Sequence, residues 1–251
     1  MLKNERLEKI MNILKTRKVI STEELQSKVY CSRSTLRRDL IELEKMKQVK
    51  RNHGSVSLVS SENIEFSYIS RVNEKSQEKK YLTEIAEDFI GNNQAIFLDA
   101  SSTVYFLCEV FETKSNPIVI TNGLQTAQRL NMFQNVTTYC SGGELKFASN
   151  AAVGELSTQF FDHFKADIAF ISCRGVNTEG LFEANQRQAL VKQRMIKNAD
   201  STILLCDHSK FNTSHFFKLA DFHLIDSIIT DRKPDKAILD RMTKSGCEVL
   251  W

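Results

Sequence analysis

The 251-residue chain has few prolines, and its cysteines lack the spacing of disulfide or metal motifs. It contains only two prolines, Pro117 and Pro234, and both fall where turns are expected, so neither interrupts a predicted helix. Its six cysteines are widely spread, with no CxxC pair and no histidine cluster to complete a zinc site. We therefore expect reduced, mostly buried thiols and no bound metal or other cofactor.

Long apolar runs are missing as well. None approaches the ~18 residues that a membrane span needs, and the charged stretch 1–6 does not have the form of a signal peptide. These absences lead us to expect a cytoplasmic protein. With 41% hydrophobic residues, the chain has room for a small domain of about 60 residues and a larger domain with its own core.

Residues 32–40, SRSTLRRDL, combine an apolar face with a basic face. Leu36, Leu40 and Leu43 follow the spacing of one helix face, so this side is expected to pack. Guanidinium groups on the other side pair bidentately with guanine edges and neutralise phosphates, and hydroxyls at the helix start add phosphate contacts. The predicted DNA contacts on this helix are Ser32, Arg33, Ser34, Thr35, Arg37 and Arg38.

The neighbouring segments decide between a DNA-recognition helix and an ordinary amphipathic surface helix. Ser21 and Glu24 have the spacing of a capping box, which predicts a short helix through residues 25–29. A tight connection then leads to a second helix capped at Ser32, which is the spacing of a helix-turn-helix. An earlier helix supplies the remaining core face, with Leu7, Ile10, Met11 and Leu14.

Downstream of residue 46 the hydrophobic period changes to two. The alternation covers residues 49–51 and 56–58, on either side of a His-Gly turn, and predicts a small hairpin that serves as a wing. Side chains near its tip are in reach of a phosphate or the minor groove, although a turn histidine is equally suited to local hydrogen bonding. The predicted DNA contacts of the wing are Lys50, Arg51 and His53.

Charge is distributed unevenly along the chain. Residues 1–60 carry a net charge of +7 and the remainder −4, so the overall +3 combines a basic head with an acidic body. A basic surface alone gives only salt-dependent affinity for nucleic acid, so any sequence specificity must come from the geometry of the helix.

The organisation we predict is a winged helix-turn-helix domain over residues 1–59, a polar linker over 60–76, and an α/β domain over 77–251. In the last part, short apolar strands alternate with helical stretches, which is typical of a largely parallel sheet. The predicted strands are residues 95–98, 118–120, 136–140, 168–171, 203–205, 224–229 and 247–250.

Ligands of such sheets bind at the carboxyl ends of the strands. Turns rich in hydroxyls favour an anion such as phosphate, and paired glycines let the backbone approach a ligand closely. Each turn alone is also suited to capping a helix, but together they supply hydroxyls, carboxylates and ammoniums for a phosphorylated polyol. The predicted contacts are Asp99, Ser101, Ser102, Thr103, Thr121, Asn122, Gly142, Gly143, Glu144, Lys146, Asp207 and Lys210.

These motifs together resemble those of the DeoR family of bacterial transcription regulators, over both domains. In the head, the matching pieces are residues 34–40 of the helix and 51–54 of the wing. In the body, the matching pieces follow the family's order at residues 98–99, 121–122, 142–144, 191–192 and 207–211. The chain departs from the family at Ser55, where a glycine is usual, at Ser101-Ser102, where a glycine and a threonine are common, and at Arg187-Gln188, where an acidic pair is common.

The resemblance implies a winged helix-turn-helix joined to a sensor domain similar to ribose-phosphate isomerases, glucosamine-phosphate deaminases and CoA transferases. It adds Lys192 to the expected effector contacts. Such regulators typically repress sugar-catabolic operons and respond to a phosphorylated sugar. We therefore expect a homodimer or homotetramer that reads paired half-sites of a double-stranded DNA operator and loses affinity when the effector binds.

Two other classes of function remain open at this stage. A sugar-phosphate isomerase would need acid and base groups, which Asp99, Glu144, Glu183, Asp207, His208 and Lys210 offer. Fold analogy does not license that reading, and Arg174-Gly175-Val176 stands where such enzymes carry an acid-rich motif. The other class is a binding module for a nucleotide or a protein. His208 and His215 are more simply hydrogen-bonded structural residues than metal ligands.

Overall fold

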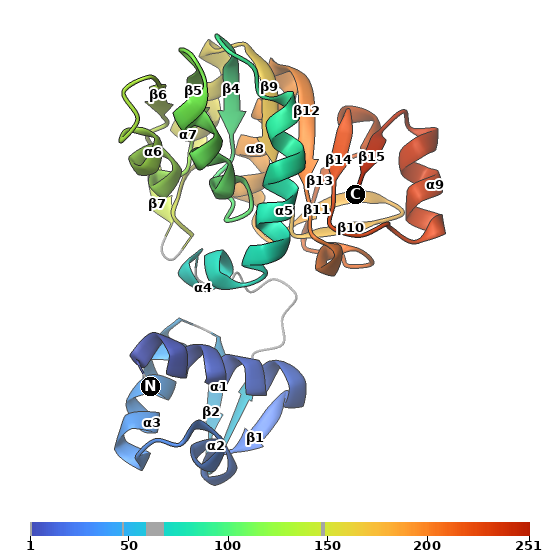
Figure 1. Cartoon of the computed structure of the whole chain (residues 1–251). Coiled ribbons are helices and arrows are strands. Elements are labelled where there is room, and N and C mark those ends of the chain that lie inside the picture. Colours follow the sequence, from blue (N-terminus) through green and yellow to red (C-terminus); the bar gives the residue numbers. More distant parts are fainter. Residues whose placement is uncertain (1, 47, 59–67, 147–148) are drawn as a thin grey trace. The chain divides into compact units, whose positions relative to one another are not determined.

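A computed structural model describes residues 2–46, 48–58, 68–146 and 149–251 (Figure 1). The chain divides into two compact units, Met1–Ser70 and Arg71–Trp251. Within the described ranges, no helix combines the length and the apolar character that crossing a membrane requires. Residues 60–67 of the predicted linker lie outside these ranges, and its remainder holds helix α4 (Tyr68–Asn73) and the start of α5 (Ser76–Ala86). The exact limits of the linker stay a prediction.

The first unit is the expected winged helix-turn-helix. Its elements are α1 (Lys3–Arg17), β1 (Val19–Ser21), α2 (Thr22–Val29), α3 (Arg33–Lys45), β2 (Val49–Asn52) and β3 (Ser55–Leu58). The strands form an antiparallel sheet in the order β1-β3-β2. The predicted apolar faces meet in one core, in which Ile10, Leu25 and Leu40 are buried together. The helix-turn-helix and the hairpin are therefore confirmed, and β1 adds a third strand that the sequence analysis did not predict.

Two serines begin the helices of this motif. The Ser21 hydroxyl accepts from the Glu24 N–H (3.1 Å), and the Ser32 hydroxyl accepts from the Thr35 N–H (3.2 Å). Only half of the predicted capping box forms, because the Glu24 carboxylate pairs with Arg17 (2.7 Å) instead of returning to the backbone of Ser21.

The second unit is built on a seven-stranded sheet in which every pairing is parallel, in the order β15-β14-β12-β9-β4-β5-β6. The strands are β4 (Ala95–Leu98), β5 (Ile118–Thr121), β6 (Thr137–Cys140), β9 (Ala166–Ile171), β12 (Ala199–Leu205), β14 (Ser227–Ile229) and β15 (Glu248–Leu250). The predicted parallel sheet is confirmed. The strand predicted at 224–229 begins only at Ser227, because Leu224 belongs to a 3₁₀ turn in which its N–H donates to Asp221 O (3.2 Å).

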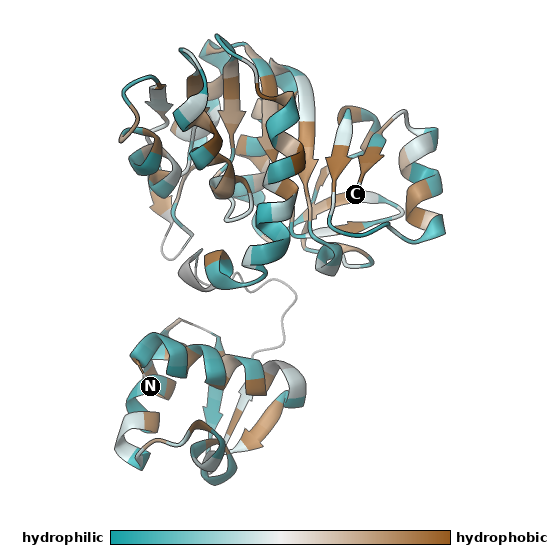
Figure 2. Ribbon diagram, in the orientation of Figure 1, coloured by the Kyte–Doolittle hydropathy of each residue, from teal (hydrophilic) through white to brown (hydrophobic). Residues whose placement is uncertain are grey.

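Helices cover both faces of this sheet, so its central strands are apolar on both sides (Figures 1 and 2). One core contains Phe97 of β4 together with α8 (Gln186–Asn198) and α9 (Lys236–Lys244). The other contains the neighbouring Ile96 and Leu98 and packs against other helices. These are α5, the 3₁₀ helix η2 (Val104–Thr113) and α6 (Leu124–Leu130). The alternation along β4 thus sends successive side chains to opposite layers.

Two smaller sheets complete the unit. The strands β10 (Gly175–Asn177), β11 (Gly180–Glu183) and β13 (Phe217–Ala220) pair antiparallel, as do β7 (Glu144–Lys146) and β8 (Ala151–Val153). Gly143 enters this hairpin at φ 125°, and a Cβ there would lie 2.7 Å from Val153 O. Gly143 therefore serves a close approach of backbone to backbone, whereas a Cβ on Gly142 would meet nothing within 4 Å. A short helix, α7 (Glu155–Phe160), follows β8.

Candidate functional site

The basic face of α3 is open on the first unit. Arg33, Arg37 and Arg38 are exposed, and none of them forms an ion pair with a residue in the described part of the chain. Leu36 and Leu40, on the opposite side, are only 3% and 2% exposed. The helix therefore presents the guanidiniums that readout of base edges and phosphates requires.

The wing is tied to the recognition helix by a contact that the sequence did not reveal. The Glu44 carboxylate of α3 accepts from the Arg51 backbone N–H (3.1 Å) and lies 3.6 Å from its guanidinium. Arg51 is thus half-buried and partly engaged, whereas Lys50 and His53 are exposed. Lys50 is therefore an exposed cation of the wing without the contact that engages Arg51.

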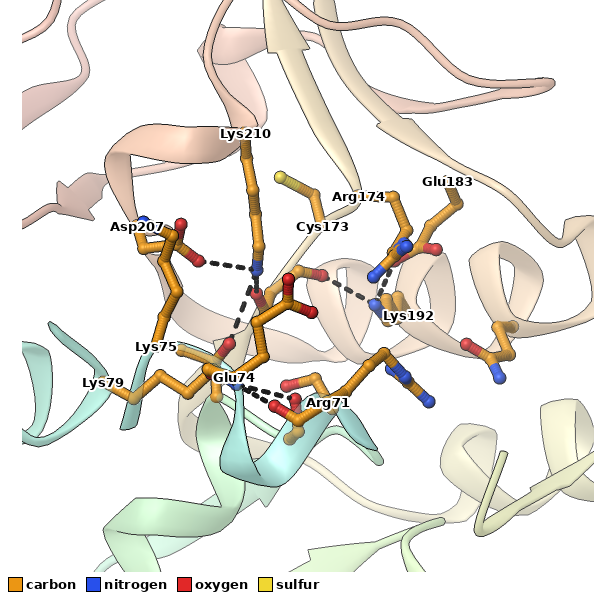
Figure 3. A pocket seen from close by; sticks show the side chains of 15 residues that line it. Arg71, Glu74, Lys75, Lys79, Cys173, Arg174, Glu183, Lys192, Asp207 and Lys210 are labelled. Atoms are coloured by element: carbon orange, nitrogen blue, oxygen red, sulfur yellow. Dashed lines mark hydrogen bonds and ion pairs between the residues drawn. The ribbon is translucent and has the colours of Figure 1, made fainter. Parts of the chain in front are cut away.

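In the second unit, a pocket lies at the carboxyl ends of the central strands β4, β9 and β12 (Figure 3). Ser101, Ser102 and Thr103 come from the turn after β4; Ser172, Cys173 and Arg174 follow β9; and Asp207 and Lys210 follow β12. Gln188 and Lys192 of α8, Glu183 of β11, and Arg71, Glu74, Lys75 and Lys79 from the α4–α5 region complete the lining. The position is the one that the parallel sheet predicted.

Lys192 is the centre of a buried charge network on one side of this pocket. Its ammonium lies 3.1 Å from Asp99, donates to Ser172 O (2.6 Å), and pairs with Glu183. Burial lowers the pKa of Lys192, but the two carboxylates raise it by more, so its pKa lies above the ordinary value and the group stays charged. Both carboxylates are 2% exposed or less, so this cation is already neutralised.

Asp99 holds two segments of the pocket together by hydrogen bonds. Its carboxylate accepts from the Ser101 N–H (2.8 Å) and from the Ser172 N–H (2.9 Å). It therefore ties the turn after β4 to the end of β9, and it is not among the residues that line the pocket. The arrangement fixes the serine-rich turn in place before any ligand arrives.

Lys210 contacts the side chain of Ser172, whereas Lys192 contacts its backbone carbonyl. The Lys210 ammonium donates to the Ser172 hydroxyl (2.9 Å) and to the Thr103 hydroxyl (3.4 Å), and it lies 3.8 Å from Asp207. Burial raises the pKa of Asp207, but Lys210 and two hydrogen bonds from Ser209 together lower it by more. The pKa of Asp207 therefore lies below its ordinary value, and the group is a carboxylate.

Lys79 of α5 is the residue that the sequence analysis missed most completely. It is 4% exposed, and its ammonium donates to Glu74 O (2.7 Å), to the Ser102 hydroxyl (3.2 Å) and to Arg71 O. Burial, and then the nearby charge of Lys210, lower the pKa of Lys79 to about 8. In the sequence, Lys79-Lys80 looks like a pair of surface lysines, and nothing there separates the buried member from the exposed one.

Several predicted effector contacts do not line this pocket. The Thr121 hydroxyl accepts from the Gly123 N–H (2.9 Å), the Asn122 amide donates to Ala152 O (2.9 Å), and Glu144 is exposed and pairs with Arg187. These residues, with Gly142 and Gly143, belong to the β7–β8 region and its attachment to the sheet, and none is among the pocket residues. The side chain of Lys146 lies outside what the structure describes.

The residues that line the pocket and were not predicted as effector contacts are Arg71, Glu74, Lys75, Lys79, Ser172, Cys173, Arg174, Glu183 and Gln188. Most follow β9, or come from helices that carry no glycine or hydroxyl motif. Ser172-Cys173-Arg174 had a usable signal, since the segment follows a predicted strand whose neighbours were both assigned to the site.

His208 is engaged with other side chains. Its Nδ1 lies 2.6 Å from Asp231, and its Nε2 lies 3.4 Å from the Lys75 ammonium. Glu78 also approaches these groups and lies 3.5 Å from Lys75. Glu78, His208 and Asp231 could together attract a cation, but the Lys75 ammonium already supplies a positive charge beside them. This favours a structural role for His208.

Both units match families of known proteins. The DeoR-like helix-turn-helix domain matches residues 6–62, and the DeoR C terminal sensor domain matches residues 74–232. The HTH-type transcriptional repressor GlcR of Bacillus subtilis is 32% identical over 100% of this chain and 96% of its own length. The glycerol-3-phosphate regulon repressor of Escherichia coli is 27% identical over 93% of each chain. The chain belongs to the DeoR family of transcription regulators, as its motifs predicted.

Membership settles the class of function. The relatives are transcription regulators, so this chain is a DNA-binding regulator with a sensor domain and not a sugar-phosphate isomerase. An operator DNA and a small-molecule effector are its implied partners. Among solved structures, a ribose 5-phosphate isomerase from Plasmodium falciparum aligns over 55% of this chain and 53% of its own, with a TM-score of 0.40 and 16% identity. That likeness is too distant to bear on function.

Proposed function

We propose that this regulator represses a sugar-metabolism operon and that a phosphorylated sugar in the pocket lowers its affinity for the operator. The observation that carries the proposal is the pairing of two largely buried ammoniums, Lys79 and Lys210, with the hydroxyls of Ser102 and Thr103. The name of the Escherichia coli relative, a glycerol-3-phosphate regulon repressor, is in keeping with a phosphorylated ligand.

The chemistry of this side of the pocket suits a phosphate dianion. Burial, and then the nearby charge of Lys210, lower the pKa of Lys79, and an anion between the two ammoniums would relieve the repulsion between them. Hydroxyls and ammoniums are both donors to phosphate oxygens. The carboxylates of Asp207 and Glu74 line the same pocket and suit sugar hydroxyls, which donate to them.

On DNA, we propose that α3 lies in the major groove with Arg33, Arg37 and Arg38 toward the bases, and that Lys50 of the wing lies on the backbone. Two heads of a homodimer or homotetramer would read paired half-sites. An effector that binds one arrangement of the heads better than the other must weaken operator affinity by the same coupling free energy, typically about 1–3 kcal/mol.

The test is a titration of the full chain with the DNA that flanks its own gene, with and without a panel of three- to six-carbon sugar phosphates. We expect tight, sequence-dependent binding that one compound releases. A compound that releases wild type but not Lys210→Met assigns the effect to the pocket, and Lys197→Met on the exposed face of α8 is the matched control. Specific DNA binding that no sugar phosphate alters contradicts the effector part of the proposal.

A further inference from the structure

Arg174 differs from the other cations of the pocket, because no described residue is a partner for its side chain. It follows β9 directly, and its guanidinium lines the pocket (Figure 3). Its Nε is fully buried with no acceptor, and its guanidinium forms no hydrogen bond or ion pair within the described ranges of the chain. The lysines 75, 79, 192 and 210 all have acceptors there.

The backbone around Arg174 is held firmly. The Arg174 N–H donates to Phe182 O of β11 (2.9 Å). A Cβ on the following Gly175 would lie 2.6 Å from Thr213 O, so two segments of backbone are in direct contact at that point. The guanidinium is therefore presented from a fixed base, and its lack of a partner is not explained by a loose loop.

The nearest candidate partners are already engaged. Glu183 lies beside Arg174 in Figure 3, but its carboxylate pairs with Lys192, which Asp99 also contacts. An unpaired buried donor is costly, so its presence calls for an explanation, and an acceptor supplied by a ligand of the pocket is one. The planar fork of an arginine matches the two oxygens of a carboxylate or a phosphate.

Two lysines of the pocket contact different atoms of Ser172. The Ser172 hydroxyl accepts from Lys210 (2.9 Å), whereas its carbonyl accepts from Lys192 (2.6 Å). In Figure 3, Arg174 lies near Lys192 and Glu183, whereas Lys79 lies on the other side of the view. The pocket thus has two separate places for negative charge, and a short polyol chain would connect them.

We propose that the effector carries a second anionic group, and that Arg174 binds it. The ligand class is a phosphorylated sugar acid or a sugar bisphosphate, and a neutral sugar carrying a single phosphate leaves Arg174 unsatisfied. This inference rests on the proposed function for the phosphate end of the ligand. What it adds is the group at the other end of the ligand, where Arg174 distinguishes ligands that share a carbon skeleton.

The test compares matched ligands by calorimetry on the full chain. Glycerol 3-phosphate is paired with 3-phosphoglycerate, glucose 6-phosphate with 6-phosphogluconate, and fructose 6-phosphate with fructose 1,6-bisphosphate. In wild type we expect the member with two anionic groups to bind at least about tenfold tighter in the pair whose skeleton fits. The first two pairs report a carboxylate, and the third reports a second phosphate.

Variants then assign the preference to Arg174. Arg174→Gln should remove most of the tenfold difference, Arg174→Lys should keep part of it, and Arg194→Gln on the outer side of α8 should keep all of it. Wild type that binds both members of a pair equally overturns the inference and leaves the proposed function standing. A preference that survives in Arg174→Gln also overturns it. Wild type that binds no member of any pair overturns the proposed function itself.

Discussion

Arg6 of α1 and Asp39 of the recognition helix α3 are joined by a two-pronged ion pair. The Arg6 Nε lies 2.5 Å from Asp39 Oδ2, and its Nη2 lies 3.0 Å from Oδ1. Asp39 is only 2% exposed, and Arg6 is the cation paired with it. The pair joins α1 to α3, the helix that also carries Arg37 and Arg38.

Removing the arginine of this pair should weaken both folding and DNA recognition. Arg6→Ala leaves a buried carboxylate without its partner, which is strongly unfavourable. We expect a lower thermal midpoint for the head and lower affinity for operator DNA, measured by calorimetry and fluorescence anisotropy. Lys3→Ala is the control, because its pair with Glu42 is largely exposed and should contribute little. Equal effects of the two substitutions would remove the role assigned to Arg6.

Arg37→Ala and Lys50→Ala should change DNA binding in different ways. Loss of a base-reading arginine should cost about 1–3 kcal/mol of binding to the operator and relax discrimination against random DNA. Loss of a phosphate-contacting lysine should weaken all DNA nearly equally and reduce the salt slope by about one. Anisotropy titrations of operator and random duplexes at several salt concentrations separate the two. Identical profiles would contradict the assignment of α3 as the reading element.

Anion binding should be linked to a proton at Lys79. Its pKa of about 8 in the free protein lies below the ordinary value of 10.5, so an anion that favours the ammonium must raise it again. Binding of a sugar phosphate near pH 8 should therefore be accompanied by proton uptake at Lys79. The affinity of the protein for the sugar phosphate should fall as the pH rises above that value. Calorimetry in buffers of different ionisation enthalpy measures the uptake. Lys79→Arg should abolish it, Lys80→Arg should not, and uptake that persists in Lys79→Arg places the proton elsewhere.

Lys192 should matter chiefly for stability. Lys192→Met leaves the buried carboxylates of Asp99 and Glu183 facing each other without their cation, a change expected to cost about 3–5 kcal/mol. The measurement is urea unfolding of the full chain followed by a signal from the second unit. Lys197→Met, at an exposed position of the same helix, should be nearly neutral. A neutral Lys192→Met would show that the network contributes no net stability.

The parts of the fold that the sequence predicted are those with a clear period. Leu36, Leu40 and Leu43 mark a helix face because they recur at helical spacing, and the parallel strands are nearly continuous apolar runs. The strands that went unpredicted are short, and β8 and β11 are buried at every residue. Such segments show no alternation, so neither their presence nor their pairing can be read from the chain.

The candidate site was predictable to the extent that it follows strand ends. Ser102 and Lys210 were placed from the strands they follow, whereas Asn122 follows a strand farther from the centre and instead holds Ala152. Lys79 reaches the pocket from a helix, through burial that depends on tertiary packing alone. Arg174 was noted in the sequence as a departure from an enzyme motif, and only the structure shows that its Nε has no acceptor among the described residues.

The most direct test of the account is the operator affinity of the full chain, measured by fluorescence anisotropy at saturating concentration of a sugar phosphate that calorimetry shows to bind. We predict that wild type loses operator affinity by about 5- to 150-fold, the usual range of allosteric coupling. Lys210→Met should retain its operator affinity under the same conditions. Unchanged affinity of wild type with the pocket fully occupied would contradict the claim that this pocket controls the DNA-binding head.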